Sequence, residues 1–210
     1  MGNSINNKLS KLYTGSDIYV RLYADTRAKL LKLDYYSQFL PTNGLLIDIG
    51  CGYGVVANYL SLRFPDIQIL GIDLDSKRIN DALKTVGKRK NITFLLKDAK
   101  EWDLPRCTGV LMTDFLHHVS SQDQELILRQ VFNRLENDGV LVISEVDPTA
   151  RPFYRYWASY LSDRALYPLS RSYFRKPHDW QNTLSHIGFS VKAIKIHSYL
   201  FAGIVYICQK

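Results

Sequence analysis

Apolar residues in this chain gather in short continuous runs, several ending at an acidic residue, and these runs alternate with segments of helical spacing. Such runs predict strands buried on both faces of a sheet. They start at Leu45, Ile67, Asn91, Gly109 and Gly139. Helical spacing covers residues 55–64, 76–86, 123–135 and 177–187, with glycines 87 and 188 as stop signals. This alternation predicts a parallel sheet with right-handed crossovers.

Two more strands are predicted near the C-terminus, over Phe189–His197 and Leu200–Cys208. The link between them is so short that they must run antiparallel. The longest uncharged apolar stretch, Tyr199–Cys208, is well below the roughly 20 residues that a membrane-spanning helix needs. No transmembrane segment is therefore expected.

A glycine-rich loop follows the first predicted strand, in the stretch LLIDIGCGYGVVA. Asp48, Gly50, Gly52 and Gly54 occupy alternate positions, and a helix is predicted directly after them. Backbone without side chains, next to the free N–H groups of a helix N-terminus, suits a nucleotide-type cofactor. A dinucleotide fingerprint would place its third glycine at position 55, where Val55 stands, which argues against a nucleotide-dependent oxidoreductase.

Further acids follow the next two strands. Asp73 ends the second strand, nineteen residues past Gly54, where a carboxylate can bind both hydroxyls of a ribose. Asp98 and Ala99 end the third strand, and Trp102 after them is interpreted as an adenine-stacking ring or as cover for the sheet edge. Each acid alone is equally consistent with a turn or helix cap, but the ordered set is not expected by coincidence.

The D-x-G-x-G-x-G loop with these ordered acids resembles the class I S-adenosylmethionine-dependent methyltransferases, tightly over about residues 40–150. The resemblance implies an α/β Rossmann-like three-layer sandwich with a seven-stranded, mostly parallel sheet of order 3-2-1-4-5-7-6, its last strand antiparallel. It implies S-adenosylmethionine as cofactor and S-adenosylhomocysteine as product. The cofactor-binding residues that it implies are Asp48, Gly50, Cys51, Gly52, Gly54, Asp73, Leu74, Asp98, Ala99, Asp114 and Phe115.

One domain is expected, divided into an N-terminal helical lid (1–40), a cofactor-binding core (41–150), a helical substrate cap (151–188) and a C-terminal strand pair (189–210). Residues 13–40 predict one or two helices, with Tyr13, Arg21 and Tyr23 as lid contacts. The alternative is an amphipathic helix packed on the sheet.

Nine of the thirty residues from Arg151 to Trp180 are aromatic, and six are basic. Aromatic rings offer an apolar wall and arginines bind anions. The substrate candidates are Arg151, Tyr154, Trp157 and His178. Phe153, Trp157 and Leu161 lie at helical spacing, which predicts that part of this stripe is core. The net charge of +7 adds to the case for an anionic partner.

We therefore expect methyl transfer to a small-molecule, acyl-chain or lipid-like acceptor by in-line displacement, with the acceptor free, on an acidic carrier protein or at a membrane surface. RNA methylation through the 151–180 segment is the alternative. A catalytically inactive partner subunit is another. TDFLHH after the fourth strand lacks the Asn/Asp-Pro-Pro-aromatic pattern of exocyclic-amine methylation. The oligomeric state stays open.

His117 and His118 are the candidate general bases, because imidazole titrates near neutral pH. Consecutive residues at a helix start are not expected both to point into the site, so His118 is preferred, with His117 second. The alternative is that one histidine caps the helix and the other packs. Glu145 and Asp147, at the end of the fifth strand, are also placed to reach a substrate. Asp114, His117 and His118 resemble, with substitutions, an E-x-x-E-H metal site, but no metal is expected.

Three cysteines, an odd number without disulfide or metal spacing, predict reduced thiols: Cys51, Cys107 and Cys208. The first ten residues contain no apolar core, so no secretory signal is expected. Both features favour a cytoplasmic location.

Overall fold

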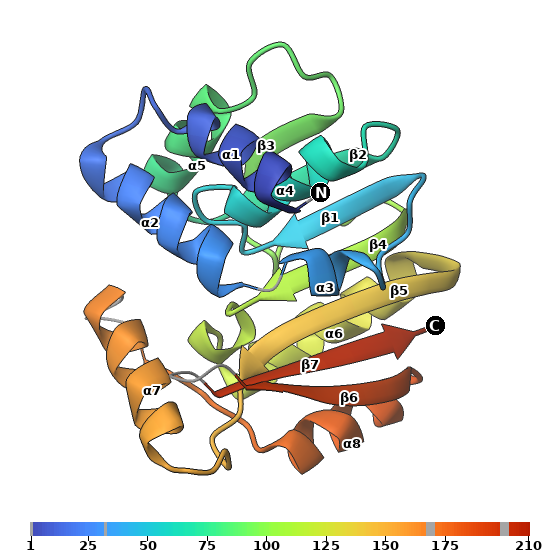
Figure 1. Cartoon of the computed structure of the whole chain (residues 1–210). Helices are drawn as coiled ribbons and strands as arrows, with labels where there is room; N and C mark the ends of the chain where they lie inside the picture. The colour runs from blue at the N-terminus through green and yellow to red at the C-terminus, as the bar shows by residue number, and fades with distance from the viewer. Residues whose placement is uncertain (1, 32, 167–170, 198–201) are drawn as a thin grey trace.

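A seven-stranded mixed sheet forms the centre of the molecule (Figure 1). The computed structural model describes residues 2–31, 33–166, 171–197 and 202–210. The strand order β3-β2-β1-β4-β5-β7-β6 confirms the order that the resemblance implied. The strands are β1 (Leu45–Ile49), β2 (Gln68–Asp73), β3 (Ile92–Leu96), β4 (Cys107–Thr113), β5 (Leu135–Val146), β6 (Ser190–His197) and β7 (Ala202–Gln209).

Strands β1 to β5 are parallel, and β7 runs antiparallel to both of its neighbours, β5 and β6. The carboxyl ends of β1, β2, β3 and β4 therefore meet at one edge of the sheet. The strand ends and loops at this edge carry the acids that the sequence singled out. Leu200, the first residue of the predicted final strand, lies outside the described residues.

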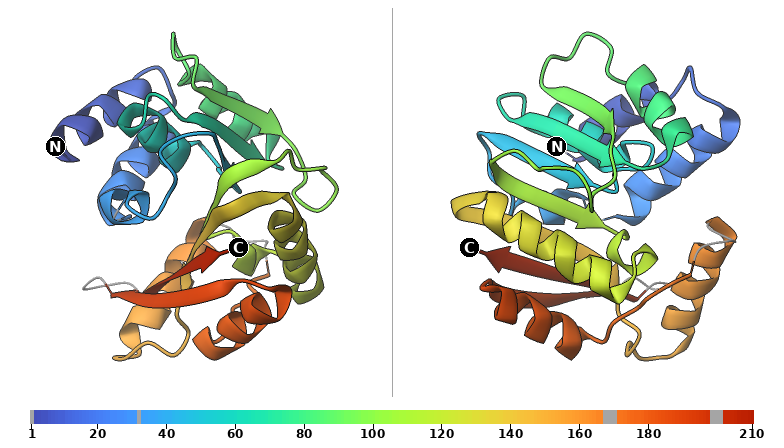
Figure 2. Two further views of the ribbon diagram at one scale, coloured as in Figure 1. Left: turned by 90° about the vertical axis from the view of Figure 1, so that its right-hand side faces the viewer. Right: turned by 180° about the vertical axis from the view of Figure 1, so that it is seen from behind.

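Helices cover both faces of the sheet, as Figure 2 shows. One face packs against α1 (Gly2–Leu12), α2 (Ile18–Leu30), α3 (Leu33–Ser37), α4 (Val55–Arg63) and α5 (Ser76–Lys84). The other face packs against α6 (Ser121–Arg134) and α8 (Pro177–Ile187). The helix α7 (Tyr154–Leu166) lies at the edge where the parallel strands end (Figure 1).

Helices α2 and α3 lie within residues 13–40, where one or two helices were expected, and α1 lies in the part of the predicted helical segment (1–40) for which no particular helix was expected. The reason for α1 lies in α4, whose residues Val55–Ser61 are all buried. A helix that is buried on every side needs cover beyond the sheet. Leu9 of α1 and the following Tyr13 supply it, because both are 1% exposed within the core on this face.

Two details of the α6–β5 region differ from prediction. Helix α6 begins at Ser121, capped by the Ser120 hydroxyl, which accepts from the Asp123 amide. Strand β5 begins at Leu135, before the predicted turn. Its register with β4 shifts between Cys107 and Gly109, so the turn forms a bulge within the strand. Asp138 has φ +63° there, a conformation in which aspartate is enriched.

The 151–188 segment divides into two parts. Helix α8 packs on the sheet through the buried Trp180 and Leu184, like the other flanking helices. Helix α7 instead turns Ser159 and Asp163 inward. The prediction that the stripe of Phe153, Trp157 and Leu161 is core is wrong, since these side chains are 53%, 55% and 61% exposed. Helical spacing identified the stripe but not the side that packs.

No helix among the described residues is long and apolar enough to cross a membrane. The cysteines at positions 51, 107 and 208 are free and buried, as the odd count predicted.

Candidate functional site

The glycine loop joins β1 to α4 with left-handed backbone at its three glycines. Gly50, Gly52 and Gly54 have φ of +75°, +54° and +75°. The loop is fixed to the neighbouring strand, because the Gly50 and Cys51 amides both donate to the Ile72 carbonyl, at 2.9 and 3.0 Å. The positions differ in their surroundings. The Phe115 ring covers Gly50, whereas nothing lies within 4 Å of where a Cβ of Gly52 would stand. Gly52 thus borders open space.

Asp73 is tied to this loop, as expected of a nucleoside-binding acid. Its Oδ2 accepts from the Gly52 amide at 2.8 Å, and its Oδ1 accepts from the Asp75 amide at 2.9 Å. The next side chain, Leu74, is 68% exposed. A carboxylate oriented by two backbone amides next to an exposed apolar side chain matches a ribose and its base.

Asp48 is a buried acid near the end of β1, directly before the loop. Neither of its carboxyl oxygens has a hydrogen-bond partner among the described residues, although the residue is 1% exposed. Burial raises its pKa to about 7. A buried carboxyl group without a donor is costly, so a native structure is expected to supply one. The amino group of a bound methionine moiety would fit this role.

Asp98 and Ala99 lie two residues or more beyond β3, which ends earlier than predicted, at Leu96. The two strand ends are adjacent, because the Lys97 amide donates to the Asp73 carbonyl at 3.0 Å. The Oδ1 of Asp98 accepts from the Lys100 amide at 2.9 Å, and its side chain is partly exposed. This carboxylate can still accept from an exocyclic amine.

Asp114 follows β4 with φ +50°, and an ion pair holds its carboxylate. The Arg27 guanidinium of α2 donates to Asp114 Oδ2 at 2.6 Å and to the Thr113 carbonyl at 3.3 Å. Arg27 was not predicted. Its contacts span 86 and 87 residues of sequence, so no local pattern signals them.

The three lid candidates are placed differently. Tyr13 is buried, with its hydroxyl donating to the Tyr53 carbonyl of the glycine loop at 2.9 Å and accepting from Asn58 Nδ2. It supports the loop from beneath. Tyr23 reaches the loop, its ring meeting that of Tyr53 edge-on at 5.1 Å. Arg21 is exposed.

The histidine pair lies on a short 3₁₀ turn, η1 (Leu116–His118), directly after β4. His117 Nδ1 lies 2.5 Å from Glu145 Oε2, and its Nε2 lies 3.3 Å from Asp163 Oδ1. His118 Nε2 lies 3.3 Å from the same Asp163 oxygen. Both rings thus reach one carboxylate of α7, and the expectation that only one of them points into the site stays a prediction.

Their surroundings shift the two imidazoles in opposite directions. Burial alone would lower the pKa of His117, but the carboxylates of Glu145 and Asp163 outweigh it and raise that pKa to about 10. Burial, followed by the charge of His117, lowers the pKa of His118 to about 4. Neither ring titrates near neutral pH, contrary to expectation. In the absence of a bound cation, His117 is therefore the protonated ring and His118 the neutral one at pH 7.

The four substrate candidates are all exposed. Arg151 lies over the Phe153 ring at 3.9 Å, and Tyr154 and Trp157 lie on the outer side of α7. The ring of His178 on α8 meets Asn182 of the same helix at 2.9 Å.

Three unpredicted aromatic residues from the same segment lie nearer the histidines: Tyr156, Tyr160 and Phe174. The Phe174 ring stacks on His117 at 4.8 Å. Tyr160 meets Phe174 at 6.5 Å and Trp157 at 5.7 Å, so aromatic rings continue from the buried histidine to the exposed tryptophan. The aromatic richness of the segment was visible in the sequence, but the side facing the histidines was not.

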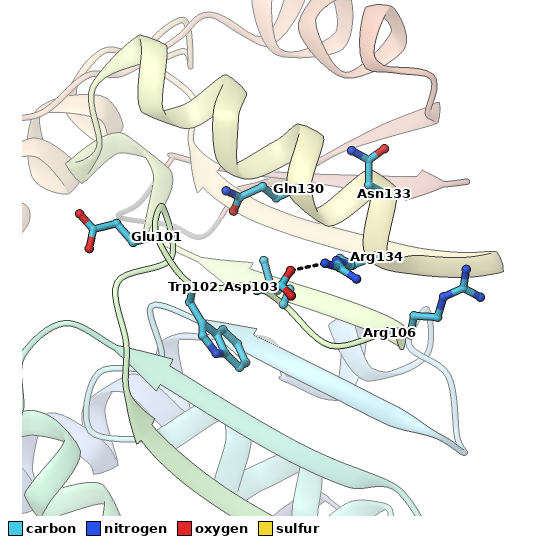
Figure 3. Close-up of a pocket in the computed structure, with 8 residues that line it drawn as sticks. Glu101, Trp102, Asp103, Arg106, Gln130, Asn133 and Arg134 are labelled. Carbon is cyan, nitrogen blue, oxygen red and sulfur yellow. Dashed lines mark hydrogen bonds and ion pairs between the residues drawn. The ribbon is translucent and has the colours of Figure 1, made fainter.

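A surface hollow of about 480 Å³ lies elsewhere, between the loop after β3 and α6 (Figure 3). It is lined by Glu101, Trp102, Asp103, Leu104, Arg106, Gln130, Asn133 and Arg134, and Arg134 pairs with Asp103 within it. Of the residues considered for the cofactor, only Trp102 lines it, and none of the acids or glycines does, so we do not assign the hollow to the cofactor.

Comparison with known proteins identifies a methyltransferase domain in the part of the chain that contains the glycine loop. Residues 46–139 match a family model described as a methyltransferase domain. The chain is 24% identical over 163 residues to malonyl-[acyl-carrier protein] O-methyltransferase of Legionella pneumophila, covering 74% of this chain and 56% of that protein. It is 27% identical over 131 residues to trans-aconitate 2-methyltransferase of Methylobacterium radiotolerans, covering 58% and 49%. The chain thus spans about half the length of the curated relatives it matches.

Solved structures share the fold. Magnesium protoporphyrin IX methyltransferase of Synechocystis, with bound S-adenosylhomocysteine, superposes with a TM-score of 0.70 at 17% identity, covering 95% of this chain and 91% of that one. Human N-acetylserotonin methyltransferase, in complex with S-adenosylmethionine, gives 0.71 at 16% identity, covering 91% and 55%.

Proposed function

The chain belongs to the class I S-adenosylmethionine-dependent methyltransferases, and from that premise we propose that it methylates a small-molecule or acyl-chain acceptor with an apolar body. The cofactor supplies a methyl group already activated on a sulfonium. The protein therefore has to bind it, align the acceptor and keep water out.

The cofactor would lie along the edge where β1, β2, β3 and β4 end. Gly52 leaves the space, Asp73 would bind the ribose hydroxyls, and Asp98 would accept from the adenine amine. Asp48 would receive the amino group of the methionine part. Such a ligand fits the carboxyl of Asp48, which has no hydrogen-bond partner among the described residues, and the open side of Gly52.

The aromatic series from Trp157 through Tyr160 and Phe174 to His117 is the observation that carries the acceptor class. Aromatic walls favour apolar ligands, and one polar group at the inner end can fix their orientation. His118, whose ring lies 4.2 Å from that of His117, supplies a polar group at this end. A carrier-bound acyl chain is the first acceptor to test, because the relative from Legionella pneumophila is named for one.

The RNA alternative finds less support. Arg175 of the basic segment donates to the Ser121 carbonyl and to Thr183, and it pairs with Glu125. Its charge is thus used within the protein. The inactive-partner alternative predicts no cofactor binding, which makes it separable by experiment.

Two measurements test the proposal. Calorimetric titration with S-adenosylmethionine and S-adenosylhomocysteine should show micromolar binding of both. Transfer of a labelled methyl group should then be screened over acyl-carrier-bound, free acyl, phenolic and RNA acceptors. We expect transfer to an apolar acceptor. Transfer to RNA alone would refute the acceptor class, and no cofactor binding would favour the inactive partner.

Matched variants locate the acceptor. Trp157→Ala should raise KM for the apolar acceptor several-fold and leave cofactor affinity unchanged, because the ring lies at the outer end of the aromatic series. Leu126→Ala is the control. Leu126 is also a large exposed apolar residue, but it lies on α6, which packs on a face of the sheet and is not part of the aromatic series. Equal KM values in the two variants would remove α7 from the acceptor site.

A further inference from the structure

Three ligand-type side chains converge between η1 and α7. His117, His118 and Asp163 each offer one ligand atom, and these atoms all lie within 4.8 Å of one another. We propose that they bind a divalent transition-metal ion, zinc being the best match, through both Nε2 atoms and the Asp163 carboxylate, with one coordination position left open. This inference goes beyond the proposed function and does not depend on it, because metal binding is measurable without donor or acceptor.

The distances suit a shared ion better than direct hydrogen bonds. His117 Nε2 and His118 Nε2 each lie 3.3 Å from the same oxygen, Asp163 Oδ1. An N–H···O hydrogen bond is usually about 2.9 Å long. A tetrahedral ion with bonds of about 2.0–2.1 Å separates neighbouring ligand atoms by roughly 3.3 Å. The two distances to Asp163 Oδ1 therefore match edges of a coordination tetrahedron, and the third ligand pair lies within 4.8 Å.

The donor atoms are oriented by a second layer of contacts. Glu145 Oε2 lies 2.5 Å from His117 Nδ1, which directs the opposite nitrogen, Nε2, toward Asp163. The Leu116 amide holds the other oxygen of Glu145 at 2.8 Å, and the Ser172 hydroxyl donates to Asp163 Oδ2 at 2.8 Å. A carboxylate on the far nitrogen of a ligating histidine is the common outer layer of zinc sites.

Burial and composition narrow the choice of ion. The side chains of His117 and Asp163 are 2% and 8% exposed, and that of His118 is 16% exposed. An ion from solvent would therefore reach the cluster from the side of His118. Two imidazoles and a carboxylate suit zinc and its first-row neighbours, whereas magnesium and calcium prefer oxygen ligands. Three protein ligands with an open position are typical of ions that bind a further molecule.

The ligand set differs from the D-x-x-H-H pattern in the sequence. Asp114 is paired with Arg27 instead, at 2.6 Å. Asp163 takes its place from α7, 46 residues beyond His117. The site also lies close to the glycine loop, since Phe115, two residues before His117, packs on Gly50.

The test is metal titration of the chelator-treated full chain near neutral pH. Zinc binding is followed by calorimetry, and cobalt is used as a spectroscopic probe because tetrahedral Co²⁺ gives intense visible bands. We expect one equivalent of either ion to bind with micromolar or stronger affinity. His118→Ala and Asp163→Asn should each weaken binding more than about tenfold. Glu145→Gln should weaken it by about 10- to 100-fold.

Two control variants carry the same chemical changes elsewhere. His186→Ala and Asp66→Asn alter exposed residues and should bind the ions as the unmodified chain does. Circular dichroism checks that every variant is folded. If His118→Ala does not fold, the isosteric Asp163→Asn still tests the site. Binding below one equivalent, or equal affinity in Asp163→Asn and Asp66→Asn, would overturn the proposal.

Discussion

Two glycines of the same loop should respond in different ways to the same substitution. Gly50 and Gly52 both have left-handed backbone, so alanine at either position carries the same conformational cost. Their surroundings differ. A Cβ at Gly50 would lie 2.3 Å from a carbon of the Phe115 ring, whereas a Cβ at Gly52 would have nothing within 4 Å. Stability and ligand affinity should therefore separate.

The expected magnitudes follow from those contacts. An L-residue in left-handed backbone costs about 1–2 kcal/mol, so Gly52→Ala should lower the free energy of unfolding by that amount. Overpacking adds about 1–3 kcal/mol, which brings the expected loss for Gly50→Ala to roughly 2–5 kcal/mol. If the cofactor fills the open space at Gly52, the methyl group of Gly52→Ala should displace it and weaken binding at least tenfold, or about 1.4 kcal/mol.

Urea denaturation gives the free energies of unfolding, and calorimetric titration with S-adenosylhomocysteine gives the affinities. The informative result is Gly52→Ala, in which a modest loss of stability should accompany a large loss of affinity. If it binds S-adenosylhomocysteine as tightly as the unmodified chain does, the space beside Gly52 is not the cofactor site. If Gly50→Ala is no less stable than Gly52→Ala, the Phe115 ring moves aside freely and the packing argument fails.

Three further predictions concern the acids of the loop and the residue beneath it. Asp73→Asn should weaken S-adenosylhomocysteine binding more than about tenfold, because charge-assisted hydrogen bonds to the ribose are lost. Calorimetry compares its affinity with that of the control variant Asp66→Asn. Equal affinities would remove Asp73 from the ribose site. The folded pKa of Asp48, about 7, lies above its ordinary 3.8, so its contribution to stability is present below about pH 3.8 and is lost as the pH rises through 7. As the pH rises from 3.8 to 7, the free energy of unfolding of Asp48→Asn, measured in urea titrations, should therefore increase relative to that of the unmodified chain. A difference in this free energy that stays constant over the same pH range would contradict the raised pKa. Tyr13→Phe should lower the free energy of unfolding by about 1–3 kcal/mol, since the Tyr53 carbonyl and Asn58 lose a buried partner. The control Tyr19→Phe, at an exposed residue, should change this free energy little. Similar free energies of unfolding for both variants would show that the buried hydroxyl contributes nothing.

The sequence predicted the sheet and its flanking helices well, because those signals are local. Runs such as the one at Gly109 remain apolar whichever neighbour they pair with, and Gly188 ends α8 where predicted. The acids at the strand ends lie at one edge because parallel strands share a direction. That part of the site follows from topology once the strands are recognised.

Residues brought in from distant segments could not be predicted in this way. Arg27 reaches Asp114, and Asp163 reaches both histidines, across long stretches of sequence. The pKa values of the histidines depend on these partners, so they were also beyond local inference. The Trp157 stripe failed for a related reason: an amphipathic pattern shows that a helix has an apolar side, but the partner decides whether that side is covered.

The place of β7 between β5 and β6 sets an order on how the chain can assemble during synthesis. Among the described strands, β6 pairs with β7 alone, yet the ribosome makes β6 first. Residues 190–197 therefore have no sheet to join until residues 202–209 have emerged. Over the same interval the edge of β5 stays open, and an open edge invites pairing with other chains. The hairpin of β6 and β7 should dock on β5 as one unit, which makes this late step the point at which a nascent chain would depend most on chaperones.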